Sequence, residues 1–293
     1  MGAIENSIRL STFNRYKQIV HIHLIPELGK IKLKNLSPTQ IQNLYLKKIK
    51  ALSPRTVQYI HTTLRLSLSY DVRFNLTNSN VADSVNPPRL IKKEITPLGL
   101  EEVNRLFETI DGHPLEALFV LACTTGWRRG EILGLQWKDI DLDKGTLQVQ
   151  RSLSLIKGGP VFNSPKTNKS KRNVGVSNVC VKALIKHELL QESKWWAKDY
   201  GLVFPNKKGE PRRSRNTLNY TFELIKTKGN LPDVRFHDLR HTCATLLLGK
   251  GVHPKIVQEM LGHATITQTM DTYGHVLPNM QEKAVAAMED IFE

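Results

Sequence analysis

The chain has 293 residues, more than one compact domain usually holds, so two domains with separate cores are expected. Its 42 Lys and Arg residues exceed its 27 Asp and Glu residues, giving a net charge of +15 and an isoelectric point near 9.7. This favours a polyanionic partner, either nucleic acid or an anionic membrane. No run of about 18 apolar residues and no signal peptide are found, which argues against a membrane role and predicts a cytosolic or nuclear protein.

The positive charge is unevenly distributed along the chain. Residues 1–93 contain 15 Lys and Arg against 4 Asp and Glu, a net +11, whereas residues 94–293 contain 27 against 23, a net +4. The N-terminal third is therefore predicted to provide the main general contact with a polyanion.

No metal or disulfide site is predicted. Cys123, Cys180 and Cys243 are scattered without a CxxC spacing, so we expect three small buried side chains. His21 and His23 form an HxH pair, but nothing near them completes a ligand set.

Helical periodicity dominates the N-terminal region. Residues 11–25 predict a first helix, with Ser11 or Thr12 as its N-cap and Pro26 as its end. Two Ser-Pro pairs predict the starts of two further helices, since Ser is a good N-cap and Pro suits the first helical position. These pairs are Ser37-Pro38 and Ser53-Pro54, and the third helix is expected to end near Phe74.

A proline-rich, basic segment separates this region from the rest. It spans residues 86–97 and lacks helical periodicity, which is typical of an extended linker. We therefore predict a helical domain over residues 1–85 and a second domain over residues 98–293.

The second domain is predicted to be mostly helical around a small β section. A period-two pattern over residues 145–152 and two short runs within 157–177 predict three strands of an antiparallel sheet, following a turn at residues 124–126. The fold class is thus mainly α with a small antiparallel β-sheet. Helices are expected at Leu100–Ile110, Leu115–Cys123, from about Val179, His237–Gly249, Pro254–Leu261 and Asn279–Phe292.

Three short stretches contain residues suited to phosphate chemistry. In TTGWRRGEILGLQWKDID a glycine turn places Arg128 at the start of a short helix, where its guanidinium could bind a phosphate or simply form a surface salt bridge. In HDLRHTCATLLLGKGV, His237 and Arg240 are three residues apart and share one helix face, which is also common on solvated helices. In LGHATITQTMDTYGHV, His263 precedes Tyr273 by ten residues.

Together these stretches resemble the tyrosine recombinase, or phage integrase, family. Its pattern is TGxR, a β-turn Lys, HxxR, LGH and a TYxH-like segment, and the chain has TGWR, PKTNKSKR, HDLR, LGH and TYGH in that order. The resemblance covers about Ser11 to Phe292. It implies a helical core-binding domain, a linker and a mixed α/β catalytic domain that cleaves and rejoins DNA through a 3′-phosphotyrosyl intermediate.

The resemblance also implies a role for each matched residue. Tyr273 would be the nucleophile and Arg128 and Arg240 would hold the two non-bridging phosphate oxygens. Lys166 on the β-hairpin would protonate the leaving 5′ oxygen, with Lys169 as the alternative. The remaining implied residues are His237, which would help to handle the tyrosine proton, His263, which would bond the phosphate, and Glu131, which would orient its neighbours.

Physical chemistry is consistent with this set. Fixed cations stabilise the negative charge that grows on a phosphodiester in the transition state, so two arginines could replace a metal. A phosphotyrosine ester has about the energy of the bond broken, so no ATP is needed. Hence no cofactor is predicted. Two departures from the family are RNVGVS in place of a Val-Pro-Leu-like strand, and the bulky Trp127.

The implied partner is double-stranded DNA, with no membrane. An apolar stripe near the C-terminus could pack on its own domain or on a neighbouring protomer: Ala284, Val285, Met288, Ile291 and Phe292. The resemblance implies docking on a neighbour, which would build a homo-tetramer on two duplexes. The implied biology is integration or excision of a phage or mobile element in the bacterial cytoplasm, at the nucleoid. Two alternatives are a non-catalytic DNA-binding protein with this fold and a type IB topoisomerase.

Overall fold

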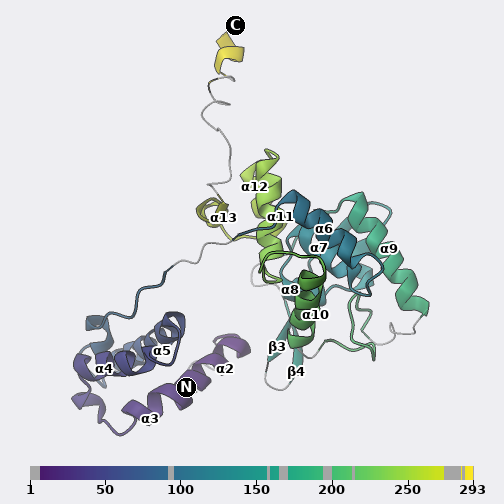
Figure 1. Ribbon diagram of the computed structural model, residues 1–293. Helices are drawn as coiled ribbons and strands as arrows, with labels where there is room; N and C mark the ends of the chain where they lie inside the picture. Colours follow the sequence, from purple (N-terminus) through teal and green to yellow (C-terminus); the bar gives the residue numbers. More distant parts are fainter. Residues whose placement is uncertain are drawn as a thin grey trace. The chain divides into compact units, whose positions relative to one another are not determined.

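The computed structural model describes residues 7–91, 96–156, 159–164, 171–193, 200–212, 215–273, 285 and 288–292 (Figure 1). The chain forms two compact units, Met1–Glu94 and Ile95–Glu293, and the division falls within the segment predicted to be a linker. Both units are mainly helical and the second contains small antiparallel sheets, which confirms the predicted fold class. Within the part of the chain that is described, no helix combines the length and apolar character needed to cross a bilayer.

The N-terminal unit is a small helical bundle. Ser37 and Ser53 cap their helices by accepting hydrogen bonds from the backbone N–H groups of Gln40 and Thr56, as the two Ser-Pro pairs predicted. Ile41 and Ile60 are fully buried in its core. The elements are α2 (Leu10–Ile19), η1 (Val20–Leu24), α3 (Ile25–Leu28), η2 (Leu33–Asn35), α4 (Pro38–Ile49), α5 (Pro54–Arg73) and η3 (Val81–Ser84).

The predicted end of the first helix at Pro26 was wrong. The helical run continues to Leu28 through the π-helical turn η1, in which the N–H of Ile25 bonds the carbonyl of Val20, five residues back. This wider turn lets the chain pass the missing N–H of Pro26 without ending the helix. The predicted N-cap at Ser11 or Thr12 was also wrong, because the helix begins at Leu10 and has no side-chain cap.

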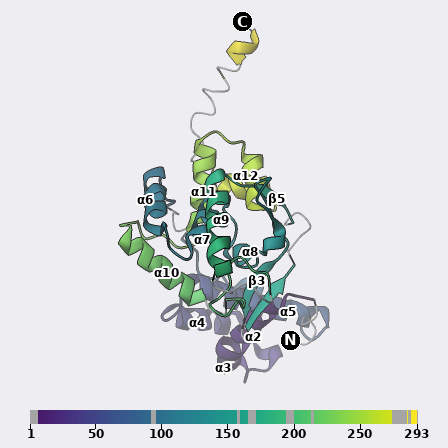
Figure 2. The same cartoon turned by 90° about the vertical axis from the view of Figure 1, so that its right-hand side faces the viewer.

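The C-terminal unit is built around α7 (Glu116–Thr125). Every residue from Ala117 to Cys123 is buried, because α7 packs against both α9 (Asn178–Ser193) and α11 (Asp238–Gly249). In Figure 2, α6 (Leu100–Ile110) and α10 lie at one edge of this unit, and the strands at the opposite edge. The remaining helices are α8 (Arg129–Leu133), η4 (Trp137–Asp139), α10 (Arg215–Lys228), α12 (Pro254–Leu261) and α13 (Ile266–Tyr273).

Helix α10 was not predicted. Its residues Leu218, Phe222 and Ile225 are buried and recur at spacings of four and three residues. This stripe was a usable helical signal. The predicted C-terminal helix over 279–292 lies largely outside the described residues.

The strands form two sheets rather than one. β1 (Ile140–Asp141), β2 (Thr146–Gln148) and β5 (Asn173–Gly175) form one antiparallel sheet, and β3 (Ser152–Ile156) pairs with β4 (Gly159–Asn163) in a separate hairpin. The single strand predicted over 145–152 was therefore wrong. The chain leaves β2 before Arg151, whose side chain forms an ion pair with Asp139, and enters the other sheet.

Candidate active site

Four of the residues singled out from the sequence lie where α7 and α12 end and where α8 and α11 begin: Arg128, His237, Arg240 and His263. Helices α11, α12 and α13 pack on one another, and α7 packs on α8 and α11. The TGWR, HDLR and LGH stretches are therefore adjacent in space, although they lie far apart in the chain.

A glycine turn delivers Arg128 to this site. Gly126 ends α7 in the left-handed conformation, with φ at +62°, and a Cβ at this position would lie 2.5 Å from Cδ2 of Leu261. Trp127 is then buried, and Arg128 occupies the N-cap position of α8. The side chain of Arg128 remains 40% exposed, so it is accessible to a ligand.

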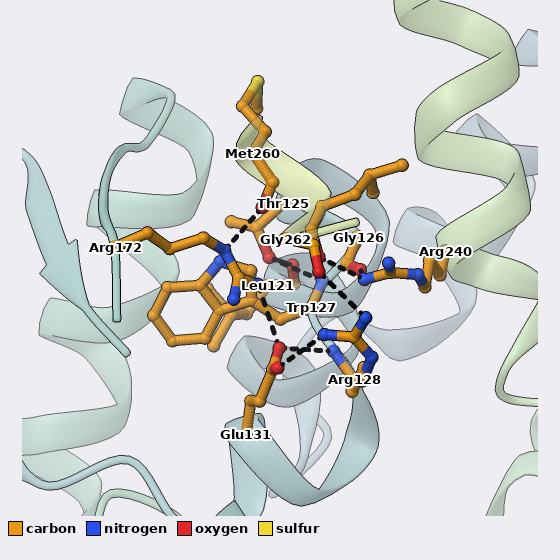
Figure 3. A network of polar contacts seen from close by, with 11 residues as sticks. Leu121, Thr125, Gly126, Trp127, Arg128, Glu131, Arg172, Arg240, Met260 and Gly262 are labelled. Carbon is orange, nitrogen blue, oxygen red and sulfur yellow. Dashed lines mark hydrogen bonds and ion pairs between the residues drawn. The ribbon is translucent and has the colours of Figure 1, made fainter. Parts of the chain in front are cut away.

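Three guanidinium groups converge on the carboxyl end of α12 (Figure 3). Arg172 Nε donates to the carbonyl of Met260 at 2.8 Å, and Arg128 Nη2 donates to the carbonyl of Gly262 at 3.0 Å. The third is Arg240, whose Nη1 donates to the carbonyl of Leu261 at 2.8 Å. A helix leaves its last carbonyls without intrahelical partners and carries partial negative charge there, so it is a natural anchor for cations.

Arg240 is buried but only partly satisfied. Its side chain emerges from α11, the residue is 4% exposed, and Nη1 also donates to the carbonyl of Gly126 at 2.8 Å. Nη2 is buried and has no hydrogen-bond partner among the described residues. Burial, with the nearby charge of Arg128, lowers the pKa of Arg240 to about 10. A buried cationic donor without a partner is costly, and an anion would relieve this cost.

Glu131 links two of the arginines. Its Oε1 accepts from Arg128 Nη1 at 2.9 Å, and its Oε2 accepts from the Arg128 backbone N–H at 3.0 Å and from Arg172 Nη2 at 2.9 Å. Burial acts to raise the pKa of Glu131, but the charges and hydrogen bonds of Arg172 and Arg128 outweigh it, and the pKa is lowered. The carboxylate therefore stays ionised and orients both guanidinium groups.

Tyr273 is the last residue of α13 and is 3% exposed. Its Oη lies 2.6 Å from Nδ1 of His241, on α11. Burial raises the pKa of Tyr273 to about 12, although Arg240 acts in the opposite direction. The hydroxyl is thus protonated at neutral pH and needs an acceptor for its proton to become a nucleophile.

The two predicted histidines differ in their surroundings. His263 is buried, its Nδ1 lies 2.8 Å from Oγ1 of Thr269, and burial together with Arg240 lowers its pKa to about 3. His237 occupies the N-cap of α11 and is exposed, yet partial desolvation followed by the charge of Arg240 lowers its pKa. His237 also lines a groove of about 470 Å³ beside two surface arginines, Arg129 and Arg235.

The predicted general acid lies outside the described residues, as does the alternative, Lys169. Lys166 belongs to residues 165–170 between β4 and β5, and the structure describes only the residues on either side of this segment. The segment leads through Lys171 into Arg172, which belongs to the arginine cluster. The chain thus returns to the site directly after the lysine-bearing segment.

The sequence reasoning missed two members of the site. Arg172 ends the PKTNKSKR stretch, in which the lysines were the candidates, and its buried ion pair with Glu131 distinguishes it from the exposed Lys171. His241 follows Arg240 and lies four residues after His237, a spacing that places both rings on one helix face. That spacing was an available signal.

The cysteines and possible metal ligands add nothing to the site. Cys123, Cys180 and Cys243 are free and buried, as expected. In the described ranges no three His, Cys, Asp or Glu side chains are grouped as metal ligands.

Comparison with known families identifies the class of protein. The model of the phage integrase family matches residues 97–280, and that of the phage integrase N-terminal SAM-like domain matches residues 2–50. The chain belongs to the phage integrase family, the tyrosine recombinases, which confirms the family resemblance of its motifs.

Individual relatives support this membership. The chain is 32% identical over 290 residues to a "Tyrosine recombinase XerC-like" protein of Caldanaerobacter subterraneus subsp. tengcongensis, covering 91% of this chain and 74% of the relative. The fold of this chain matches that of the Tn1549 transposon integrase, solved with a circular intermediate DNA, with a TM-score of 0.82 at 22% identity. The match covers 99% of this chain and 97% of the Tn1549 integrase chain. The fold also matches a lambda integrase tetramer bound to a Holliday junction, with a TM-score of 0.66 at 19% identity, covering 91% of this chain and 72% of the lambda integrase chain.

Proposed function

We propose that this chain is a site-specific recombinase that cleaves and rejoins duplex DNA and so integrates or excises a mobile element. The observation that carries the proposal is the buried Nη2 of Arg240, which has no hydrogen-bond partner in the described part of the chain, beside the exposed guanidinium of Arg128. Two cationic forks with free donors form a site for one phosphate. The family membership and the adjacent Tyr273 make a DNA phosphodiester the fitting ligand.

The reaction follows from these groups. Tyr273 Oη attacks the phosphorus and passes its proton to a neighbouring histidine, the bond from phosphorus to the 5′ oxygen breaks, and the leaving oxygen takes a proton from Lys166. Arg128 and Arg240 stabilise the charge that builds on the non-bridging oxygens, which is the role a metal plays in other phosphoryl-transfer enzymes. Rejoining reverses these steps with a 5′ hydroxyl as nucleophile, and neither step consumes ATP.

The assembly we propose is a homo-tetramer on two DNA duplexes. The lambda integrase structure similar to this chain is a tetramer on a Holliday junction. Near the C-terminus, four apolar side chains are each more than half exposed, which supports docking on a neighbouring protomer: Val285, Met288, Ile291 and Phe292.

The test is capture of the covalent intermediate. Binding sites are first selected from a randomised duplex library, then prepared as radiolabelled, nicked suicide substrates that lose the fragment needed for rejoining. Incubation without metal or ATP should give a denaturation-resistant protein–DNA adduct with the wild type and none with Tyr273→Phe. Specific DNA binding with no adduct from the wild type would instead support a non-catalytic DNA-binding protein, and relaxation of any supercoiled plasmid by a monomer would support a topoisomerase.

A further inference from the structure

The hydroxyl of Tyr273 is held by a histidine that is not part of the family motif set described above. Tyr273 Oη and His241 Nδ1 are 2.6 Å apart, and their ring centroids are 5.6 Å apart. The tyrosine ring packs in a small apolar cluster with Ala244, Leu248, Val257 and Leu261, which fixes the direction of its hydroxyl. The contact is therefore a built feature of the packing between α11 and α13.

His237, to which the motif assigns the tyrosine proton, lies one helical turn before His241. Its ring makes an edge contact with His241, with centroids 5.6 Å apart. In the described part of the chain, the hydrogen bond of the Tyr273 hydroxyl is to His241. His237 instead faces the groove beside Arg129 and Arg235.

We propose that His241 is the catalytic base that accepts the hydroxyl proton of Tyr273. The inference rests on the proposed recombinase function. As Oη forms its bond to phosphorus, the O–H bond breaks and the proton moves to the Nδ1 lone pair of His241, which becomes an imidazolium. During rejoining the imidazolium returns this proton to the departing tyrosine oxygen, so protons balance over the cycle.

The surroundings of His241 determine its strength as a base. Burial, followed by His237, lowers the pKa of His241 to about 4, while Asp238 acts to raise it and Arg240 and Arg235 act to lower it. The free ring is therefore neutral near pH 7 and its lone pair is available. A bound phosphate would offset the charge of Arg240, and this would strengthen the base when substrate is present.

The first experiment separates holding the hydroxyl from accepting its proton. His241→Asn places an amide oxygen near the position of Nδ1, so it can accept a hydrogen bond but not a proton. With the suicide substrate described above, we expect the cleavage rate of His241→Asn and His241→Ala to fall by on the order of 10²–10⁴-fold. His21→Asn, at an exposed histidine of the N-terminal unit, is the matched control and should cleave at the wild-type rate.

A second substrate tests whether His241 acts on the proton of the Tyr273 hydroxyl or on the proton given to the leaving 5′ oxygen. Replacing the bridging 5′ oxygen by sulfur gives a thiolate leaving group, which departs without a general acid because a thiol is far more acidic than an alcohol. Lys166→Ala should regain cleavage on this substrate. Both His241 variants should remain slow, since their defect is at the nucleophile.

Two results would overturn the inference while leaving the recombinase function intact. One is cleavage by His241→Asn at the wild-type rate, which would reduce His241 to a structural hydrogen-bond acceptor. The other is rescue of His241→Asn by the sulfur substrate, which would place its action at the leaving group. A wild-type protein that forms no adduct would overturn both proposals. Unchanged thermal midpoints and duplex affinities would show that the variants are folded.

Discussion

At the scale of single residues, Glu131 and Arg172 show how a buried ion pair organises a site. Both side chains are 7% exposed, and the guanidinium of Arg172 also lies over the Trp127 ring, 5.5 Å from its centroid. Such a pair recovers the cost of desolvating its charges only while both partners are present. Losing one partner leaves the other charge buried and uncompensated.

We therefore predict that Arg172→Ala lowers the free energy of unfolding by about 3 kcal/mol. It should also slow DNA cleavage, because the Glu131 carboxylate, once it has lost its bond to Arg172, would hold the Arg128 guanidinium less firmly. Arg172→Lys should recover only part of both properties, since an ammonium cannot bond Glu131 and Met260 with a planar fork. Denaturant unfolding and adduct formation measure the two effects. Lys171→Ala, at an exposed neighbour, is the control, and equal effects at both positions would contradict the prediction.

The histidines make stability depend on pH. The pKa values of His241 and His263 are lowered to about 4 and about 3 from an ordinary 6.5. Below pH 6.5 the unfolded chain therefore binds protons that the folded chain does not, so stability should fall as pH decreases from 6.5 toward 4. After allowance for solvent screening, we expect a loss of about 1 kcal/mol or more by pH 5.

Denaturant unfolding at pH 7, 6 and 5 measures this dependence. His263→Asn should have a smaller dependence than the wild type, because one of the proton-linked groups is gone. An identical pH profile for the two proteins would exclude a contribution from His263.

At the scale of elements, the carboxyl end of α12 organises the arginine cluster. Its Gly262 has φ at +67°, and a Cβ there would lie 2.6 Å from Arg172 Nη1 and 3.0 Å from its guanidinium carbon. The left-handed conformation ends the helix and turns His263 into the site, while the absence of a side chain leaves room for Arg172.

Gly262→Ala should consequently destabilise the protein by about 1–3 kcal/mol and lower the cleavage rate. Gly112→Ala is a matched control, because Gly112 has a similar φ of +71° but nothing lies within 4 Å of its Cβ position. The difference between the two variants in denaturant unfolding isolates the steric contact with Arg172. Equal destabilisation at both sites would mean that backbone strain alone accounts for the effect.

At the scale of the whole molecule, the uneven charge predicts how DNA binding depends on salt. Residues 1–93 carry most of the net charge, so their exposed lysines should release more counterions than those of the C-terminal unit. We expect Lys32→Ala/Lys34→Ala to reduce the slope of log affinity against log salt by about 1 to 2. The matched pair Lys207→Ala/Lys208→Ala, also at exposed positions, should change it less. Fluorescence anisotropy with a non-specific duplex measures both, and the reverse order would contradict the prediction.

Much of the site could be predicted because its chemistry is encoded locally. The TGWR, HDLR and LGH stretches each carry a reactive side chain together with the turn or helix start that presents it. Periodicity likewise indicated most helices, and the Ser-Pro pairs indicated two of their starts. The family and the fold class therefore follow from the sequence by itself, as do the proposed catalytic residues other than His241.

Only the tertiary structure decided which groups touch. Arg128 and Gly262 are 134 positions apart, and no local pattern reports that their atoms bond. The same holds for the contact between Tyr273 and His241, and for Arg172, which looks like its basic neighbours until the fold buries it against Glu131. Burial and hydrogen-bond partners arise from packing between distant segments, so the burial of Arg240 Nη2 and the shifted pKa values emerge only when the helices come together.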